Sequence, residues 1–318
     1  MKNYTNKNIL VVGGAGYIGG YLTDILINDG HKVTVYDNLL YETRYLKDIN
    51  FVYGDILDRE KLLPILDKFD VVIWLAAIVG DGACAIDPAM TKAVNEDCVK
   101  WVVDNYNGRI VFASTCSVYG IQNNLIDELA GFNPQSIYAS TKLAAEKYIV
   151  ENHNDYLIFR LGTLFGLGDY FSRIRLDLVV NILTARAVKG ETLTVFGGEQ
   201  WRPLLHVKDV GNAVSFCLKN GVVGLFNLSY KNFRINQIAE EIALLINEVK
   251  IEYADMEFED LRNYKVKTDK IRSTGWTPTF TIKDGINEIK SLIKENRIIN
   301  SDDPVYHNAA FMEENYGT

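Results

Sequence analysis

The chain has 318 residues, of which 48% are hydrophobic and 23% are charged. These fractions are typical of a globular protein with a large core and exclude a disordered or fibrous chain. The net charge of −8 disfavours nucleic acid and anionic membrane as partners. No apolar run is long enough to span a bilayer, and the N-terminus carries no signal-peptide pattern, so we expect a cytoplasmic protein.

The four cysteines and four histidines argue against disulfides and metal. The cysteines are irregularly spaced, which is typical of free thiols in a reducing compartment. The histidines are scattered, and no CxxC pair is present, so we predict no metal site.

Short apolar runs alternate with helical patterns in the first half of the chain. The predicted strands are residues 9–12, 33–36, 51–53, 71–75, 110–113 and 157–159. The predicted helices are residues 17–28, 59–68, 88–106 and 138–152. Continuous apolar strands are typical of parallel sheets that are covered on both faces. We therefore predict an α/β fold with a doubly wound parallel sheet.

The pattern changes after Gly166. The predicted helices here are residues 174–189, 207–220, 235–248 and 282–296. Residues 192–196 are a predicted strand, and residues 225–228 are expected to return to the main sheet. We predict a smaller, discontinuous lobe over the carboxyl ends of the strands. The tail from Ser301 to Thr318 shows no clear periodicity.

A glycine-rich loop joins the first predicted strand to the first helix. Gly13, Gly16 and Gly19 fit G-x-x-G-x-x-G, and the set 14, 16 and 19 fits G-x-G-x-x-G. Glycine lets the backbone approach a pyrophosphate, and the helix N-terminus offers N–H groups to the anion. Asp37 ends the second strand, where a carboxylate holds the ribose hydroxyls of NAD and repels the 2′-phosphate of NADP. The alternative is a plain tight turn beside a surface aspartate.

These features predict NAD as the cofactor and divide the chain into two functional parts. Residues 1–168, with a returning segment at about 205–228, form a Rossmann domain. Residues 169–204 and 229–318 form the substrate-binding lobe. The predicted cofactor-binding residues are Gly13, Gly16, Tyr17, Ile18, Gly19, Asp37, Asn38, Asp55, Ile56, Leu75, Ala76, Ala77, Tyr138 and Lys142.

The predicted catalytic residues are Tyr138, Lys142 and Thr115. Tyr138 and Lys142 are four residues apart and share one face of a helix. The lysine ammonium favours the phenolate of Tyr138 and so lowers the pKa of the phenol. A general base that works at neutral pH needs such a lowered pKa. Thr115 ends the preceding strand and can orient a substrate oxygen. The alternatives are an exposed helix tyrosine and a strand-end cap.

Together these motifs resemble the extended short-chain dehydrogenase/reductases, and more narrowly the nucleotide-sugar epimerase/dehydratase group. The similarity continues through Arg160-Leu-Gly162, the segment 202–209 (RPLLHVKD), Arg262 with Tyr264, and Gly275-Trp276. It therefore covers about residues 8 to 295. It implies that Lys142 also holds the nicotinamide ribose, and that Arg202 and Arg262 bind the substrate diphosphate; the alternative is that both form surface ion pairs. The predicted substrate-binding residues are Thr115, Thr163, Arg202 and Arg262.

The sequence differs from other members of the group at two places, and these differences limit which reaction we expect. Cys116 and Ser117 stand where the 4,6-dehydratases carry an Asp-Glu pair, and Thr163 stands where galactose epimerases carry an asparagine. The chain is also similar to bacterial capsule enzymes that act at C4 of GDP-linked heptoses. We therefore expect NAD-dependent oxidation at C4 of a nucleotide-activated hexose or heptose, by a 4-epimerase or a C4 dehydrogenase. A 4-keto reductase or dehydratase and a non-catalytic dinucleotide sensor are the alternatives.

The resemblance implies a homodimer or higher homo-oligomer. The helices predicted at residues 88–106 and 138–152 carry apolar residues on more than one face. One face must meet the sheet, and the other can build a four-helix bundle with a second copy.

Overall fold

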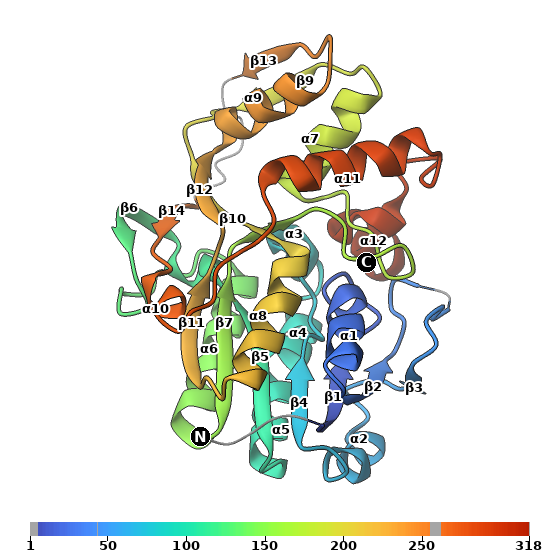
Figure 1. Cartoon of the computed structure of the whole chain (residues 1–318), viewed down its shortest axis with the longest axis vertical. Helices are drawn as coiled ribbons and strands as arrows, with labels where there is room; N and C mark the ends of the chain where they lie inside the picture. Colours follow the sequence, from blue (N-terminus) through green and yellow to red (C-terminus); the bar gives the residue numbers. More distant parts are fainter. Residues whose placement is uncertain (1–5, 43, 255–261, 318) are drawn as a thin grey trace.

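The computed structural model describes residues 6–42, 44–254 and 262–317 (Figure 1). The ends of the predicted domains, residues 1–5 and 318, lie outside the described residues. A seven-stranded parallel sheet has the order β11-β7-β5-β4-β1-β2-β3. Its strands are β1 (Asn8–Val12), β2 (Lys32–Asp37), β3 (Asn50–Tyr53), β4 (Val71–Trp74), β5 (Arg109–Thr115), β7 (Tyr156–Leu161) and β11 (Gly224–Leu228). This confirms the predicted doubly wound fold, including the return of residues 224–228 to the sheet.

The sheet is buried on both faces because its strands are apolar at successive positions. In β1, Leu10 and Val12 pack into one core, and Ile9 and Val11 pack into the other. The first core is completed by α2 (Arg59–Leu66), α5 (Cys98–Asn105) and α6 (Ile137–Asn152). The second is completed by α1 (Gly19–Asn28) and α8 (Val207–Lys219).

A smaller group of elements lies above the carboxyl ends of the strands (Figure 1). Its helices α7, α9 and α11 share a third apolar core with β9 and β10. The strands outside the main sheet form three small sheets: β6 (Ile121–Ile126), β8 (Thr163–Phe165), β9 (Leu193–Phe196), β10 (Trp201–His206), β12 (Lys231–Arg234), β13 (Ile251–Ala254) and β14 (Asn263–Val266). The helices that follow them in this half of the chain are α7 (Val179–Val188), α9 (Ile235–Leu245), α10 (Asp269–Arg272) and α11 (Ile282–Lys294). This placement leaves a cleft between the sheet edge and the smaller group.

Two predicted helices differ from the structure. The helix predicted over residues 174–189 begins only at Val179, because Arg175 pairs with Asp177 and the N–H of Leu176 donates to Tyr306 O. The helix predicted over residues 88–106 is three pieces: α4 (Pro88–Lys92), a π-helical turn and α5. The π-helical turn carries Asn95, whose side chain bonds both N (2.9 Å) and O (2.8 Å) of Ile78. The two hydrogen bonds from Asn95 in the π-helical turn thus fix the loop after β4.

The C-terminal segment, residues 301–317, docks on the body of the protein. It forms a short turn (Pro304–Tyr306) and then α12 (Asn308–Tyr316), which packs against α3 (Asp81–Ile86). Met312 is fully buried. Across the described ranges, no helix combines the length and hydrophobicity needed to cross a membrane.

Candidate active site

The glycine loop between β1 and α1 requires glycine at two of its positions. Gly13 has φ +80°, and a Cβ there would stand 2.4 Å from the backbone N of Ala76. A Cβ on Gly19 would stand 2.1 Å from the carbonyl O of Gly14. The loop therefore lies flat against the strand ends, and the unpaired N–H groups at the start of α1 are open to an anion.

Asp37 is locked in place at the end of β2. Its carboxylate accepts hydrogen bonds from N–H of Ala15 (3.0 Å) and Leu39 (2.8 Å). Burial raises the pKa of this carboxyl, and the two backbone bonds oppose that rise. Asn38 beside it donates to Asp55 Oδ2 at 2.9 Å. The strand-end polar groups that were predicted to hold the adenosine half of NAD thus lie together.

One cavity of about 1240 Å³ runs along the carboxyl edge of the sheet. It exceeds the volume of about 300–1,000 Å³ that is usual for one small ligand, so it has room for a dinucleotide and a second molecule. Every predicted site residue except Gly19 lines it: Gly13, Gly16, Tyr17, Ile18, Asp37, Asn38, Asp55, Ile56, Leu75, Ala76, Ala77, Thr115, Tyr138, Lys142, Thr163, Arg202 and Arg262. Gly19 instead packs under the loop. The residues present therefore fit NAD by shape and by donor chemistry.

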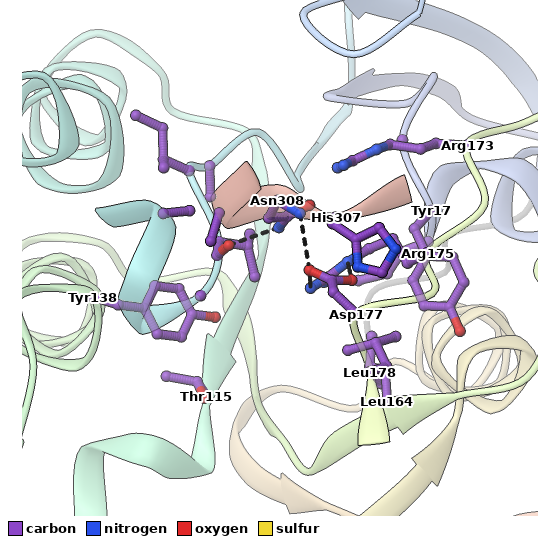
Figure 2. Close-up of a pocket in the computed structure, with 18 of the residues that line it drawn as sticks. Tyr17, Thr115, Tyr138, Leu164, Arg173, Arg175, Asp177, Leu178, His307 and Asn308 are labelled. Atoms are coloured by element: carbon purple, nitrogen blue, oxygen red, sulfur yellow. Dashed lines mark hydrogen bonds and ion pairs between the residues drawn. The ribbon is translucent and has the colours of Figure 1, made fainter. Parts of the chain in front are cut away.

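Tyr138 and Lys142 face this cavity from the first turns of α6. Ser136 caps the helix by accepting a bond from the N–H of Ala139 at 3.2 Å. The Tyr138 and Thr115 side chains lie at the same side of the pocket (Figure 2). Lys142 is buried, with Nζ 4.2 Å from the centre of the Phe112 ring. Burial lowers the pKa of Lys142 to about 7.

The electrostatics of Tyr138 differ from the sequence argument. Burial raises the pKa of the phenol, and the Cys84 thiol adds to that rise. The groups that oppose it are the Thr115 hydroxyl and the Arg175 guanidinium. Lys142, which was predicted to lower this pKa, is not among the main groups that act on Tyr138, and Arg175 from the loop before α7 opposes the rise instead.

A buried hydrogen-bond network supports the catalytic helix from behind. Glu146, one turn after Lys142, accepts from Ser114 Oγ at 2.8 Å and pairs with Arg160 at 2.6 Å. Arg160 Nη1 donates to Tyr119 Oη at 2.6 Å. The network ties α6 to the ends of β5 and β7. It fixes the distance between Thr115 and Tyr138, because those residues lie on the tied elements.

The two predicted substrate arginines meet at the opposite wall of the cavity. Arg202 Nη1 donates to the carbonyl of Trp201 at 3.0 Å and also to the carbonyl of Arg262. Arg262 Nη1 lies 3.2 Å from Asp81 Oδ2. Thr163, at the start of β8, lines the same cavity. The structure thus brings all four predicted substrate residues to one cleft.

Several cavity residues were missed as site residues in the sequence. Arg173, Arg175 and Asp177 come from the loop before α7, and His307 and Asn308 come from the C-terminal segment (Figure 2). The N–H of Asn308 donates to Asp177 at 3.0 Å, and its side chain donates to Val79 O at 2.6 Å. In the sequence, only the close spacing of Arg173 and Arg175 indicated this wall of the cavity.

Known proteins resemble the chain along most of its length. The profile of the NAD dependent epimerase/dehydratase family matches residues 9–229. A Methanocaldococcus jannaschii protein provisionally named UDP-glucose 4-epimerase is 30% identical, over 91% of this chain and 99% of its own. The dTDP-D-glucose 4,6-dehydratase of Homo sapiens is 28% identical over 91% of each chain. The X-ray structure of Pal from Bacillus thuringiensis has a TM-score of 0.79 at 26% identity, covering 91% of this chain and 99% of Pal.

These matches agree with the site geometry. The glycine loop and the strand-end carboxylate fit the cofactor that the family name states. The chain therefore belongs to the NAD-dependent epimerase/dehydratase family, the nucleotide-sugar group of extended short-chain dehydrogenases, and is an NAD-dependent enzyme.

Proposed function

We propose that this enzyme oxidises C4 of a nucleotide-activated hexose or heptose. The 4-keto sugar is then either reduced on its other face, which makes a 4-epimerase, or released, which makes a C4 dehydrogenase. GDP-linked heptose, an intermediate class in capsule synthesis, is the first substrate to test because of the narrower sequence resemblance.

In this proposal three side chains act on the reacting hydroxyl and on the cofactor beside it. Tyr138 accepts the proton of the C4 hydroxyl, and Thr115, which lines the same side of the cavity, orients that oxygen. Lys142 binds the nicotinamide ribose and holds a positive charge beneath it. When bound, oxidised NAD accepts the hydrogen of C4 as hydride and adds positive charge to the pocket.

The substrate diphosphate is assigned to Arg202 and Arg262. Bidentate guanidinium groups match the geometry of phosphate oxygens. With this assignment, residues 1–168 and 205–228 serve the cofactor, and residues 169–204 and 229–318 serve the substrate. The cavity wall from Arg173 and Asn308 belongs to the second part by sequence, yet it also borders the cofactor side.

The environment of Cys116 and Ser117 favours C4 oxidation without dehydration. Its Sγ donates to the carbonyl of Arg160 at 3.2 Å, it is fully buried, and burial raises the pKa of the thiol. Ser117 lines the cavity, but its hydroxyl accepts from Thr115 Oγ1 at 3.1 Å. Elimination of water needs an acid and a base at these two positions, and this pair supplies neither.

A panel of UDP-, GDP-, CDP- and dTDP-sugars tests the proposal. Each is incubated with the enzyme, with and without added NAD, and products are followed by mass and NMR. A product of unchanged mass with inverted C4 supports epimerisation, and a 4-keto product with two hydrogens fewer supports dehydrogenation. Loss of water from any active sugar would contradict the proposal, as would inactivity with the whole panel while NAD is bound.

We also propose a homodimer through α5 and α6. The two helices pack together, and α6 leaves Val150 43% exposed on its outer side. A second copy would cover this side. Light scattering at micromolar protein is expected to give twice the chain mass, and a monomer mass would remove the proposal.

A further inference from the structure

Arg173 is a buried cation that lines the cavity and forms no ion pair with the described carboxylates. It is 5% exposed, and its Nε has no hydrogen-bond partner within the described ranges. Nη2 donates to the carbonyl of Val305 at 3.3 Å, and Cζ lies 3.3 Å from the centre of the Tyr41 ring. Burial lowers the pKa of the guanidinium to about 10, so it stays charged at neutral pH.

The neighbouring arginine is a useful contrast. Arg175 donates two hydrogen bonds to Asp177, both 2.9 Å long, so its charge is neutralised within the protein. Among the described carboxylates, none forms an ion pair with Arg173. Asp177 and Glu42 act on Arg173 only from beyond ion-pair distance. Burial of a charge that is not directly paired is costly, so an anionic ligand in contact with Arg173 would relieve that cost.

The loop that carries Arg173 is fixed beside the N-terminus of α1. Lys47 Nζ bonds both the carbonyl of Gly20 (2.6 Å) and Asp169 (2.7 Å). Asp169 in turn accepts from the N–H of Ser172 at 2.6 Å. A Cβ on Gly20 would stand 2.1 Å from Ser172 Oγ, so the loop and the helix start are in direct contact. Arg173 therefore lies next to the glycine loop, and its guanidinium points toward the middle of the cavity (Figure 2).

The expected anion at this position is the pyrophosphate of the dinucleotide. Its two negative charges meet only backbone N–H groups at the glycine loop, because residues 13–20 contain no charged side chain. We propose that Arg173 binds the pyrophosphate of NAD from the side opposite the glycine loop. This inference uses the family's cofactor and does not depend on which sugar is the substrate.

The C-terminal segment positions this guanidinium. The Val305 carbonyl accepts from Arg173, and Asn308 fastens the segment to Asp177 and Val79. Phe311 contacts the Tyr41 ring, with centroids 4.7 Å apart, so the surface on which the guanidinium rests is held by the same segment. A tail with no sequence pattern therefore completes the cofactor site.

Calorimetric titration of the cofactor-free protein tests the proposal. Arg173→Gln is expected to weaken binding of NAD and of ADP-ribose by about 10- to 100-fold, as loss of a charge-assisted contact does. Adenosine, which lacks the pyrophosphate, is expected to bind both proteins equally. Arg272→Gln is the matched control, since it removes an exposed guanidinium on α10 and is expected to leave all three affinities unchanged.

Two further variants keep the test decisive. Arg173→Lys keeps the charge and is expected to recover part of the lost affinity. Arg173→Met keeps an aliphatic stem over Tyr41 and gives the same readout if the glutamine variant unfolds. Unchanged NAD affinity in the Gln or Met variant would overturn the proposal, as would an equal loss for adenosine. A raised KM for the sugar nucleotide with normal NAD affinity would assign Arg173 to the substrate instead.

Discussion

The two sides of the cavity hold their polar groups in different ways. On the cofactor side, Asp37 is fixed by backbone N–H groups and Lys142 is enclosed by the core. On the substrate side, Arg202 bonds carbonyl oxygens and Arg262 pairs with Asp81 at 3.2 Å. Arg262 and Asp81 each have side chains 33% exposed.

This difference indicates that the Arg262–Asp81 pair on the proposed substrate side can adjust, whereas the buried polar groups, Arg202 included, are fixed. An ion pair whose side chains are one-third exposed is worth only about 0–1 kcal/mol, so an arriving diphosphate can displace Asp81 from Arg262 at little cost. The buried groups on the cofactor side have no such freedom, because moving them would break backbone bonds or open the core. Substitutions on the cofactor side are therefore expected to affect chemistry and stability, and those on the substrate side to affect KM.

The largest expected effect is on the cofactor side. Tyr138→Phe removes the proton acceptor and keeps the ring, so turnover is expected to fall about 10²–10⁴-fold while NAD affinity stays normal. Steady-state rates and NAD titration check this. Tyr148→Phe, on the same helix and bonded to Asp104, is the control and should turn over normally. Retention of more than about a tenth of the wild-type rate in Tyr138→Phe would exclude Tyr138 as the base.

The substrate side is tested by Arg202→Ala and Arg262→Ala. Each is expected to raise KM for the sugar nucleotide by the equivalent of about 2–4 kcal/mol, because a charge-assisted contact to the diphosphate is lost. NAD affinity should not change. Arg272→Ala serves as the surface control. The assignment fails if KM is unchanged in both variants.

Burial of Lys142 is expected to make the free energy of unfolding depend on pH. Burial lowers the pKa of Lys142 to about 7 in the folded protein, whereas the ordinary lysine pKa is about 10.4. Between these two pH values the lysine is protonated in the unfolded chain and largely neutral in the folded one. Stability of the cofactor-free wild type should therefore rise with pH in this window, relative to Lys142→Met, by about 2 kcal/mol between pH 7 and 9. Urea unfolding measures this difference. Lys147→Met, exposed on the same helix, should run parallel to wild type at every pH, and parallel curves for Lys142→Met would contradict the buried ammonium.

The smallest effect is expected at Asp37. Asp37→Asn removes the charge that excludes a 2′-phosphate, so the preference for NAD over NADP should shrink about tenfold, or about 1.4 kcal/mol. Competitive titration of both dinucleotides measures the ratio. Asp48→Asn, which changes an exposed carboxylate in the segment between β2 and β3, is the control. An unchanged ratio in Asp37→Asn would remove Asp37 as the selector.

The sheet and the cofactor side could be predicted because their signals are local. The glycine loop, Asp37 and the Tyr138/Lys142 spacing each lie within one strand, turn or helix. The parallel topology follows from apolar strands separated by helices. These features need no long-range partner to be recognised.

The wall formed by Arg173 and Asn308 could not be predicted because it depends on contacts between distant segments. Asn308 reaches Val79 and Asp177, which lie 229 and 131 residues away in sequence. The same contacts explain the missed helix start, since the pairing of Arg175 with Asp177 keeps residues 174–178 out of α7. Composition alone carries no sign of such pairing.

A sugar nucleotide labelled with deuterium at C4 shows whether the enzyme oxidises that carbon. With the substrate found active in the panel, the account predicts slower turnover than with the unlabelled sugar. It also predicts that the label returns to C4 of an epimerised product or remains on the released cofactor. Deuterium at C6 of a product that has lost water would show dehydration. Turnover as fast as with the unlabelled sugar, with the label still at C4 of every product, would contradict oxidation at C4.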